Sequence, residues 1–270
     1  MSLIQAIILA IIQGLTEFLP VSSSAHLVLV PSLLGWAPPS VTFDLAVHLG
    51  TLLALVIYFA QDIVKLLRGF LLSLRPKGKR TLEERVYGRL SWLIVLGTIP
   101  IIVIGLLFKG WIESTFQSVI PAIVFLLITG VYLAIADVFS FPRKSSRELS
   151  PGGALLIGLA QAVALLPGIS RSGATISTGL LIGLRREEAA RFAFLLSIPA
   201  ILGATVLEFT TLSLAQLPLS TLLVAIVVAC AVGVLCIHFF LRLIVKTRLV
   251  WFAIYCWLFA FFALGMTFFG

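Results

Sequence analysis

Two short stretches of the sequence combine side chains that could do chemistry. Residues 13–26 read QGLTEFLPVSSSAH, and residues 167–177 read PGISRSGATIS. Both stretches lie inside long apolar segments, where an ionisable side chain costs about 2.5–3.5 kcal/mol on insertion scales. Because of that cost, Glu17, His26 and Arg171 are candidate functional residues.

The first stretch places an amide and a carboxylate on one helical face. Gln13 precedes Glu17 by four residues, which is about one helical turn. Oxygen ligands of this kind suit a hard cation such as Mg²⁺ or Ca²⁺, which also keeps several waters. We therefore predict a divalent-cation site at Gln13 and Glu17. The alternative is that Glu17 caps backbone donors or pairs with Arg171.

A serine triplet, Ser22 to Ser24, follows in the same stretch, and His26 stands two residues beyond it. A hydroxyl becomes a useful nucleophile when a base or a metal activates it. His26 could be that base, or it could protonate a leaving oxygen. A hydrogen-bonded turn accounts for the serines equally well, so both interpretations stay open.

The second stretch has the composition of an anion-binding site. Glycine allows close backbone approach, while hydroxyls and main-chain N–H groups at a helix start bind anions. Arg171 adds a planar guanidinium that matches phosphate oxygens. The residues predicted to bind phosphate are Ser170, Arg171, Ser172 and Thr175. An ion pair between Arg171 and Glu17 is the structural alternative, and the two interpretations are compatible.

The elements that must position these residues are membrane helices. Of 270 residues, 60% are hydrophobic and 11% are charged, and the mean hydropathy is +1.17. A soluble domain has roughly 45–50% apolar and about 25% charged residues, so soluble and disordered classes are excluded. The apolar runs are continuous and long, which predicts an all-α integral membrane protein rather than a barrel of short alternating strands. The segments are 3–30, 41–60, 90–108, 118–138, 153–183, 189–209, 219–241 and 249–269.

Two of these segments, 3–30 and 153–183, are longer than one span, and the polar stretches break them. Proline and clusters of serine and glycine interrupt helices, so each segment is predicted to form a re-entrant helical hairpin. Each hairpin precedes three spanning segments. The chain is thus predicted to be one membrane domain, 1–270, with six transmembrane helices in two repeats of about 1–140 and 150–270.

Basic residues set the predicted orientation. Seventeen of the 19 lysines and arginines fall in the stretches 61–89, 142–148, 184–191 and 242–248. The positive-inside rule places these stretches in the cytoplasm, so the net charge of +8 reflects topology and predicts no nucleic-acid partner. With both flanks of 153–183 inside, the two repeats are predicted to be inverted, and their breaks to meet near the midplane.

The remaining polar residues receive structural interpretations. Asp44 and His48 are four residues apart at a helix start, where Asp44 is expected to serve the helix N-terminus. The three cysteines, Cys230, Cys236 and Cys256, lie in apolar runs and are expected to be small buried hydrophobic residues.

Taken together, the two polar stretches resemble the signature motifs of the undecaprenyl-diphosphate phosphatase family, the bacitracin-resistance proteins. Layout and length agree over nearly the whole chain. The resemblance implies an inverted-repeat bundle with two re-entrant hairpins. It also implies removal of the terminal phosphate from undecaprenyl diphosphate, which yields the carrier lipid of peptidoglycan synthesis.

The same resemblance implies roles for individual residues. The catalytic residues are Glu17, Ser23, His26 and Arg171, and the metal-binding motif falls on Gln13 and Glu17. Gln13 stands where the pattern most often has Glu, which removes one possible carboxylate ligand. Ser24 and Ala25 replace a Thr-Gly pair.

The implied setting is the bacterial cytoplasmic membrane, with an active site open to the periplasmic side and a polyprenyl diphosphate lipid as partner. Broken helices in an inverted repeat are also typical of secondary transporters, so a polyprenyl-phosphate flippase is the alternative. A homodimer is compatible with the sequence, which does not require one.

Overall fold

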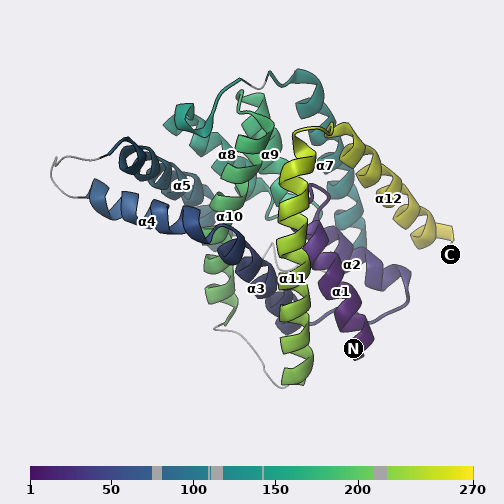
Figure 1. Ribbon diagram of the computed structural model, residues 1–270. Helices are drawn as coiled ribbons and strands as arrows, with labels where there is room; N and C mark the ends of the chain where they lie inside the picture. Colours follow the sequence, from purple (N-terminus) through teal and green to yellow (C-terminus); the bar gives the residue numbers. More distant parts are fainter. Residues whose placement is uncertain (75–80, 109, 111–117, 142, 210–217, 270) are drawn as a thin grey trace.

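The computed structural model describes residues 1–74, 81–108, 110, 118–141, 143–209 and 218–269. Within these ranges the chain is helical apart from short connections and one isolated bridge between Lys144 and Leu184. Six of the described helices are long and apolar enough to cross a membrane (Figure 1). The predicted all-α, multi-pass membrane class is therefore confirmed.

In the part of the first half that the structure describes, two short helices are followed by four more. In order, these are α1 (Leu3–Thr16), α2 (Ser23–Leu33), α3 (Val41–Tyr58), α4 (Ala60–Ser73), α5 (Leu82–Leu107) and α7 (Val119–Phe139). The second half begins with a short 3₁₀ turn. Its elements are η1 (Ser146–Glu148), α8 (Pro151–Val163), α9 (Arg171–Leu181), α10 (Arg186–Phe209), α11 (Leu219–Ile244) and α12 (Val250–Phe269).

Both helix breaks expected from the sequence are present. The helices α1 and α2 have 14 and 11 residues, and α8 and α9 have 13 and 11, all short of the ~20 needed to span a bilayer. The two breaks also share their capping. Ser22 accepts from the Ala25 N–H at the start of α2, and Ser170 accepts from the Gly173 N–H at the start of α9. This correspondence is what a chain of two repeats predicts.

The two halves of the chain interleave. The first helix of each short pair packs on a helix of the opposite half, α1 on α11 and α8 on α5, while α7 packs on α12. At the α5–α8 crossing, a Cβ added to Gly158 would lie 2.2 Å from the carbonyl oxygen of Gly97. Small residues of this kind let membrane helices approach closely. Each broken segment is thus positioned by the other half.

The basic stretch 61–89 contains more helix than the apolar segments alone indicated. It holds most of α4 and the first turns of α5, with residues 75–80 outside the described part of the chain. In α4, Ile63, Leu66 and Phe70 recur at helical spacing, so the helix has an apolar face despite its charges. That face packs on α5.

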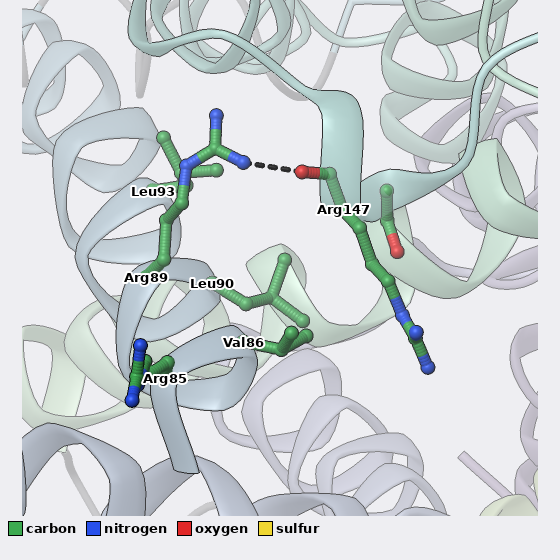
Figure 2. A pocket seen from close by; sticks show the side chains of 7 residues that line it. Arg85, Val86, Arg89, Leu90, Leu93 and Arg147 are labelled. Atoms are coloured by element: carbon green, nitrogen blue, oxygen red, sulfur yellow. Dashed lines mark hydrogen bonds between the residues drawn. The ribbon is translucent and has the colours of Figure 1, made fainter. Parts of the chain in front are cut away.

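Arg89 of α5 ties this helix to the chain that enters α8. Its guanidinium donates to the main-chain carbonyl of Arg147 (Figure 2). It also donates, at 2.7 Å, to the main-chain carbonyl of Leu149. Since α8 begins at Pro151, these bonds help to fix the start of the second broken segment.

Candidate active site

The two helix breaks are joined by one buried carboxylate. Glu17 directly follows α1, and its side chain is 5% exposed. Its Oε1 accepts a hydrogen bond from the Arg171 guanidinium, with which it forms an ion pair. Its Oε2 accepts from the Ser23 hydroxyl at 2.7 Å and from the Gln13 amide at 2.9 Å. This carboxylate therefore connects α1, α2 and α9.

The partners of Glu17 match what a buried carboxylate requires. Taking a carboxylate out of water costs several kcal/mol unless its charge is paired and its lone pairs are bonded. Arg171 supplies the opposite charge, while Ser23 and Gln13 supply neutral donors. The Arg171 side chain is 20% exposed, so it is less enclosed than the Glu17 carboxylate with which it pairs.

Direct hydrogen bonds fix one break against the other. The Ser172 hydroxyl donates to the Leu19 carbonyl at 2.9 Å. A second bond has its acceptor in the first break and its donor in the second: the Gly168 N–H donates to the Ser24 hydroxyl at 3.1 Å. These two bonds hold the two breaks together beside the pair of Glu17 and Arg171.

Helix α7 supports the second break from behind. Its Thr129 hydroxyl donates to the Gly168 carbonyl at 3.1 Å and accepts from the Ser170 N–H at 3.0 Å. Gly168 has φ +104°, and a Cβ there would lie 2.5 Å from the Ala122 carbonyl oxygen. Both the backbone conformation and the available space therefore require glycine.

The hydroxyls predicted to bind phosphate have partners within the protein. Ser170 Oγ accepts from the Gly173 N–H at 3.0 Å and lies 3.1 Å from Ser172 Oγ. Thr175 Oγ1 donates to the Arg171 carbonyl at 2.8 Å. Of the four predicted phosphate-binding side chains, that of Arg171 is the one that reaches Glu17. A phosphate contact by the other three stays a prediction.

His26 occupies a different position from the one expected of a base for Ser23. Its Nδ1 donates to the Ser22 carbonyl at 2.7 Å. In the neutral imidazole, Nε2 then accepts from the Tyr255 hydroxyl, also at 2.7 Å. The ring stacks on Phe259 with centroids 4.6 Å apart. Since the Ser23 hydroxyl donates to Glu17 instead, Glu17 is the group positioned to take its proton.

His48 of α3 lies at the site, although the sequence analysis did not assign it there. Its Nε2 is 3.9 Å from Glu17 Oε2, and its Nδ1 donates to the Asp44 carbonyl at 2.7 Å. The side chain is 31% exposed, so this imidazole borders the site on a more open side than Glu17. The sequence offered one signal for His48, its position four residues after Asp44. In the structure, however, His48 bonds the main-chain carbonyl of Asp44 and not its carboxylate.

The structure brings the Gln13 amide and the Glu17 carboxylate together, and a divalent cation held by them stays a prediction. Gln13 turns its NH₂ group toward Glu17, and its buried Oε1 has no hydrogen-bond partner in the described part of the chain. Among the described residues, no three or more His, Cys, Asp or Glu side chains group into a site of their own. One carboxylate and one amide oxygen can serve Mg²⁺ when substrate phosphates and waters complete its shell.

Known proteins resemble this chain over nearly its whole length. The family described as Bacitracin resistance protein BacA matches residues 6–262. The chain is 47% identical over 261 residues to Undecaprenyl-diphosphatase 2 of Stutzerimonas stutzeri (strain A1501), covering 94% of each chain. It is 40% identical over 262 residues to the undecaprenyl-diphosphatase of Methanosphaera stadtmanae, covering 95% of each. The predicted family is confirmed, and the chain belongs to the bacitracin-resistance (BacA) family.

Proposed function

We propose that this protein is a membrane phosphatase that hydrolyses undecaprenyl diphosphate to undecaprenyl phosphate and inorganic phosphate. One observation carries the proposal: the buried Glu17 carboxylate holds both the Ser23 hydroxyl and the Arg171 guanidinium. A nucleophile, its base and an anion-binding group thus share one site. The relatives reported above are named for this activity.

The first chemical step uses these three residues. Arg171 binds the diphosphate oxygens through the N–H groups that Glu17 does not occupy. Ser23 Oγ attacks the terminal phosphorus, and its proton passes to Glu17 at the other end of the 2.7 Å hydrogen bond. An Oγ–P bond forms, and the bond from phosphorus to the bridging oxygen breaks. Undecaprenyl phosphate leaves with that oxygen.

The second step regenerates the serine. Water attacks the phosphorus of phosphoserine, the P–Oγ bond breaks, and Oγ recovers its proton from Glu17. Inorganic phosphate is released. Direct attack by water, with Glu17 as its base, is the competing version, and it forms no phosphoserine.

A divalent cation, Mg²⁺ or Ca²⁺, completes the proposal. Glu17 would hold it, joined by Gln13 Oε1 when the amide turns its oxygen toward the carboxylate, and it would neutralise charge on the diphosphate oxygens. His48, beside Glu17, adds a further polar contact on the open side of the site.

The proposed location is the bacterial cytoplasmic membrane, with the site open to the periplasmic side. The distribution of basic residues supports this orientation. In that location the reaction recycles the carrier lipid for cell-wall synthesis, and bacitracin resistance follows from the family.

Phosphate release by purified protein in detergent tests the function. Wild type should release phosphate from undecaprenyl diphosphate, chelator should stop the release, and added Mg²⁺ should restore it. Ser23→Ala should lose about 10³ of the rate, and rapid acid quench of wild type should trap phosphoserine. Lipid movement across vesicles without phosphate release would instead support the flippase alternative.

A further inference from the structure

Helix α4 exposes large apolar side chains on one side, apart from the side that packs on α5. Four such residues recur at intervals of three and four, so they share one side of the helix, and each is 59–64% exposed. They are Val64, Leu67, Leu71 and, directly after the last helical residue, Leu74, and we call them the apolar stripe. We propose that α4 lies along the membrane interface with the apolar stripe against the lipid acyl chains.

Polar side chains occupy the other exposed side of α4. Gln61, Lys65 and Arg68 are exposed, and their spacing of four and three places them beside the apolar stripe rather than within it. A helix surrounded by water would leave the stripe uncovered, and a helix deep in hydrocarbon would leave Lys65 and Arg68 without water. A position along the interface suits both sides, and helices with separate apolar and basic sides adopt it.

Packing on the rest of the bundle fixes which side of α4 is exposed. A Cβ added at Gly69 would lie 2.5 Å from the main-chain nitrogen of Gly88, so α4 and α5 cross in close contact. Near the start of α4, Asp62 pairs with Arg191 of α10 and accepts from the Tyr87 hydroxyl of α5. Helix α4 therefore cannot turn the apolar stripe toward the protein without breaking these contacts.

The length and course of α4 also fit the interface. With 14 residues it is short of the ~20 that span a bilayer. Figure 1 shows α4 running across the direction of α11, which is one of the helices long and apolar enough to span. Near the end of α4, the Trp92 indole donates to the Ser73 hydroxyl at 2.9 Å, and Trp92 is 45% exposed. Tryptophan is enriched where a membrane meets water, which places this end of α4 at that depth.

The basic residues of α4 are paired with acidic residues of α5. Lys65 pairs with Glu83 at 2.8 Å, and Arg68 pairs with Glu84 at 2.9 Å. The apolar stripe, rather than attraction to anionic headgroups, is therefore what holds α4 at the interface. It follows that α4 lies at the same depth in neutral and in anionic membranes, whereas a helix held by charge would need anionic lipid.

Spin labels on the full-length protein in nanodiscs measure the depth of α4. One nitroxide is attached to Leu71→Cys in the apolar stripe, and another to Arg68→Cys, the matched control on the polar side. The protein without an introduced cysteine measures labelling of the native thiols. Collisions with oxygen, which partitions into lipid, are compared with collisions with a water-soluble nickel chelate. We expect the oxygen-to-nickel ratio to be at least about threefold higher for Leu71→Cys than for Arg68→Cys. The difference should be the same in phosphatidylcholine and in phosphatidylethanolamine–phosphatidylglycerol nanodiscs.

Three results would overturn the proposal. Equal ratios for the two variants would place the apolar stripe in water. Dipolar broadening of the Leu71→Cys signal, removed by dilution with unlabelled protein, would show that a second copy of the chain covers the stripe. A difference seen only with phosphatidylglycerol present would show that charge holds α4 at the interface. Leu67→Cys, in the same stripe, gives the same measurement if Leu71→Cys lowers the melting temperature.

Discussion

The pairing of Glu17 with Ser23 makes a quantitative prediction about a double-mutant cycle. If Glu17 takes the Ser23 proton, Glu17→Gln and Ser23→Ala disable the same step. General-base catalysis contributes about 10²–10⁴ in rate, so each single variant should lose about 10³ in kcat. The double variant should also lose about 10³, not the 10⁶ that independent roles would give.

The same substitution should lower stability by a calculable amount. Glu17→Gln leaves Arg171 without its carboxylate, and breaking a fully buried pair costs about 3–5 kcal/mol. The Arg171 side chain is 20% exposed, so water recovers part of that loss. We expect a decrease of about 2 kcal/mol in the free energy of unfolding. Activity must therefore be compared well below the melting temperature of each variant.

The assay is phosphate release from undecaprenyl diphosphate in detergent, with unfolding followed on the same preparations. Glu84→Gln is the control, because Glu84 pairs with Arg68 on the surface and lies outside the site. It should keep full activity. The reasoning is refuted if the single losses multiply in the double variant, or if Glu17→Gln keeps more than about a tenth of the wild-type rate.

Three further substitutions test the surroundings of Glu17. His48→Leu removes the polar atom 3.9 Å from Glu17 and should lower kcat/KM about tenfold. His48→Gln keeps a polar group and should have a kcat/KM within about threefold of wild type. Equal losses of kcat/KM in the two variants would contradict a polar role of His48 at the site. Tyr255→Phe removes the hydroxyl bonded to His26 and should leave kcat within about twofold, because the proposed steps pass no proton through His26; a tenfold loss of kcat would contradict this. Gly168→Ala should lower the free energy of unfolding by about 1–3 kcal/mol, because Gly168 has φ +104°. Gly152→Ala is the control, because a Cβ added at Gly152 meets nothing within 4 Å. Equal melting temperatures of the two variants would contradict this prediction.

Local signals were sufficient to predict most of the helices. Hydropathy placed spans at 41–60 and 219–241, and the structure has Val41–Tyr58 and Leu219–Ile244. Pro20 and Pro167, with the serines after them, marked both breaks. Helix α4 was missed because its charges outweighed its apolar face when whole segments were scored for hydropathy.

The contacts within the site were harder to predict than its location. Intramembrane charge identified Glu17 and Arg171 as a candidate pair, because leaving either one alone would be costly. The choice of Ser23 among three serines depends on the backbone of Ser22, which has φ +68°. His48 and Tyr255 come from α3 and α12, and only tertiary packing brings them to the first helix break.

The site must keep a base ionised next to a highly charged anion, and its composition follows from that demand. Glu17 alone would repel a diphosphate, and a diphosphate alone would favour protonation of Glu17. Arg171 can bind both the Glu17 carboxylate and the diphosphate. Its guanidinium has five N–H donors in one plane, and Glu17 occupies only one edge of that plane. A divalent cation held by Glu17 and Gln13 would add positive charge beside the carboxylate and so favour its ionised form as well. Ser23 can therefore pass its proton to a carboxylate that Arg171 keeps ionised, while the same guanidinium holds the diphosphate, so one residue serves both substrate binding and activation of the nucleophile.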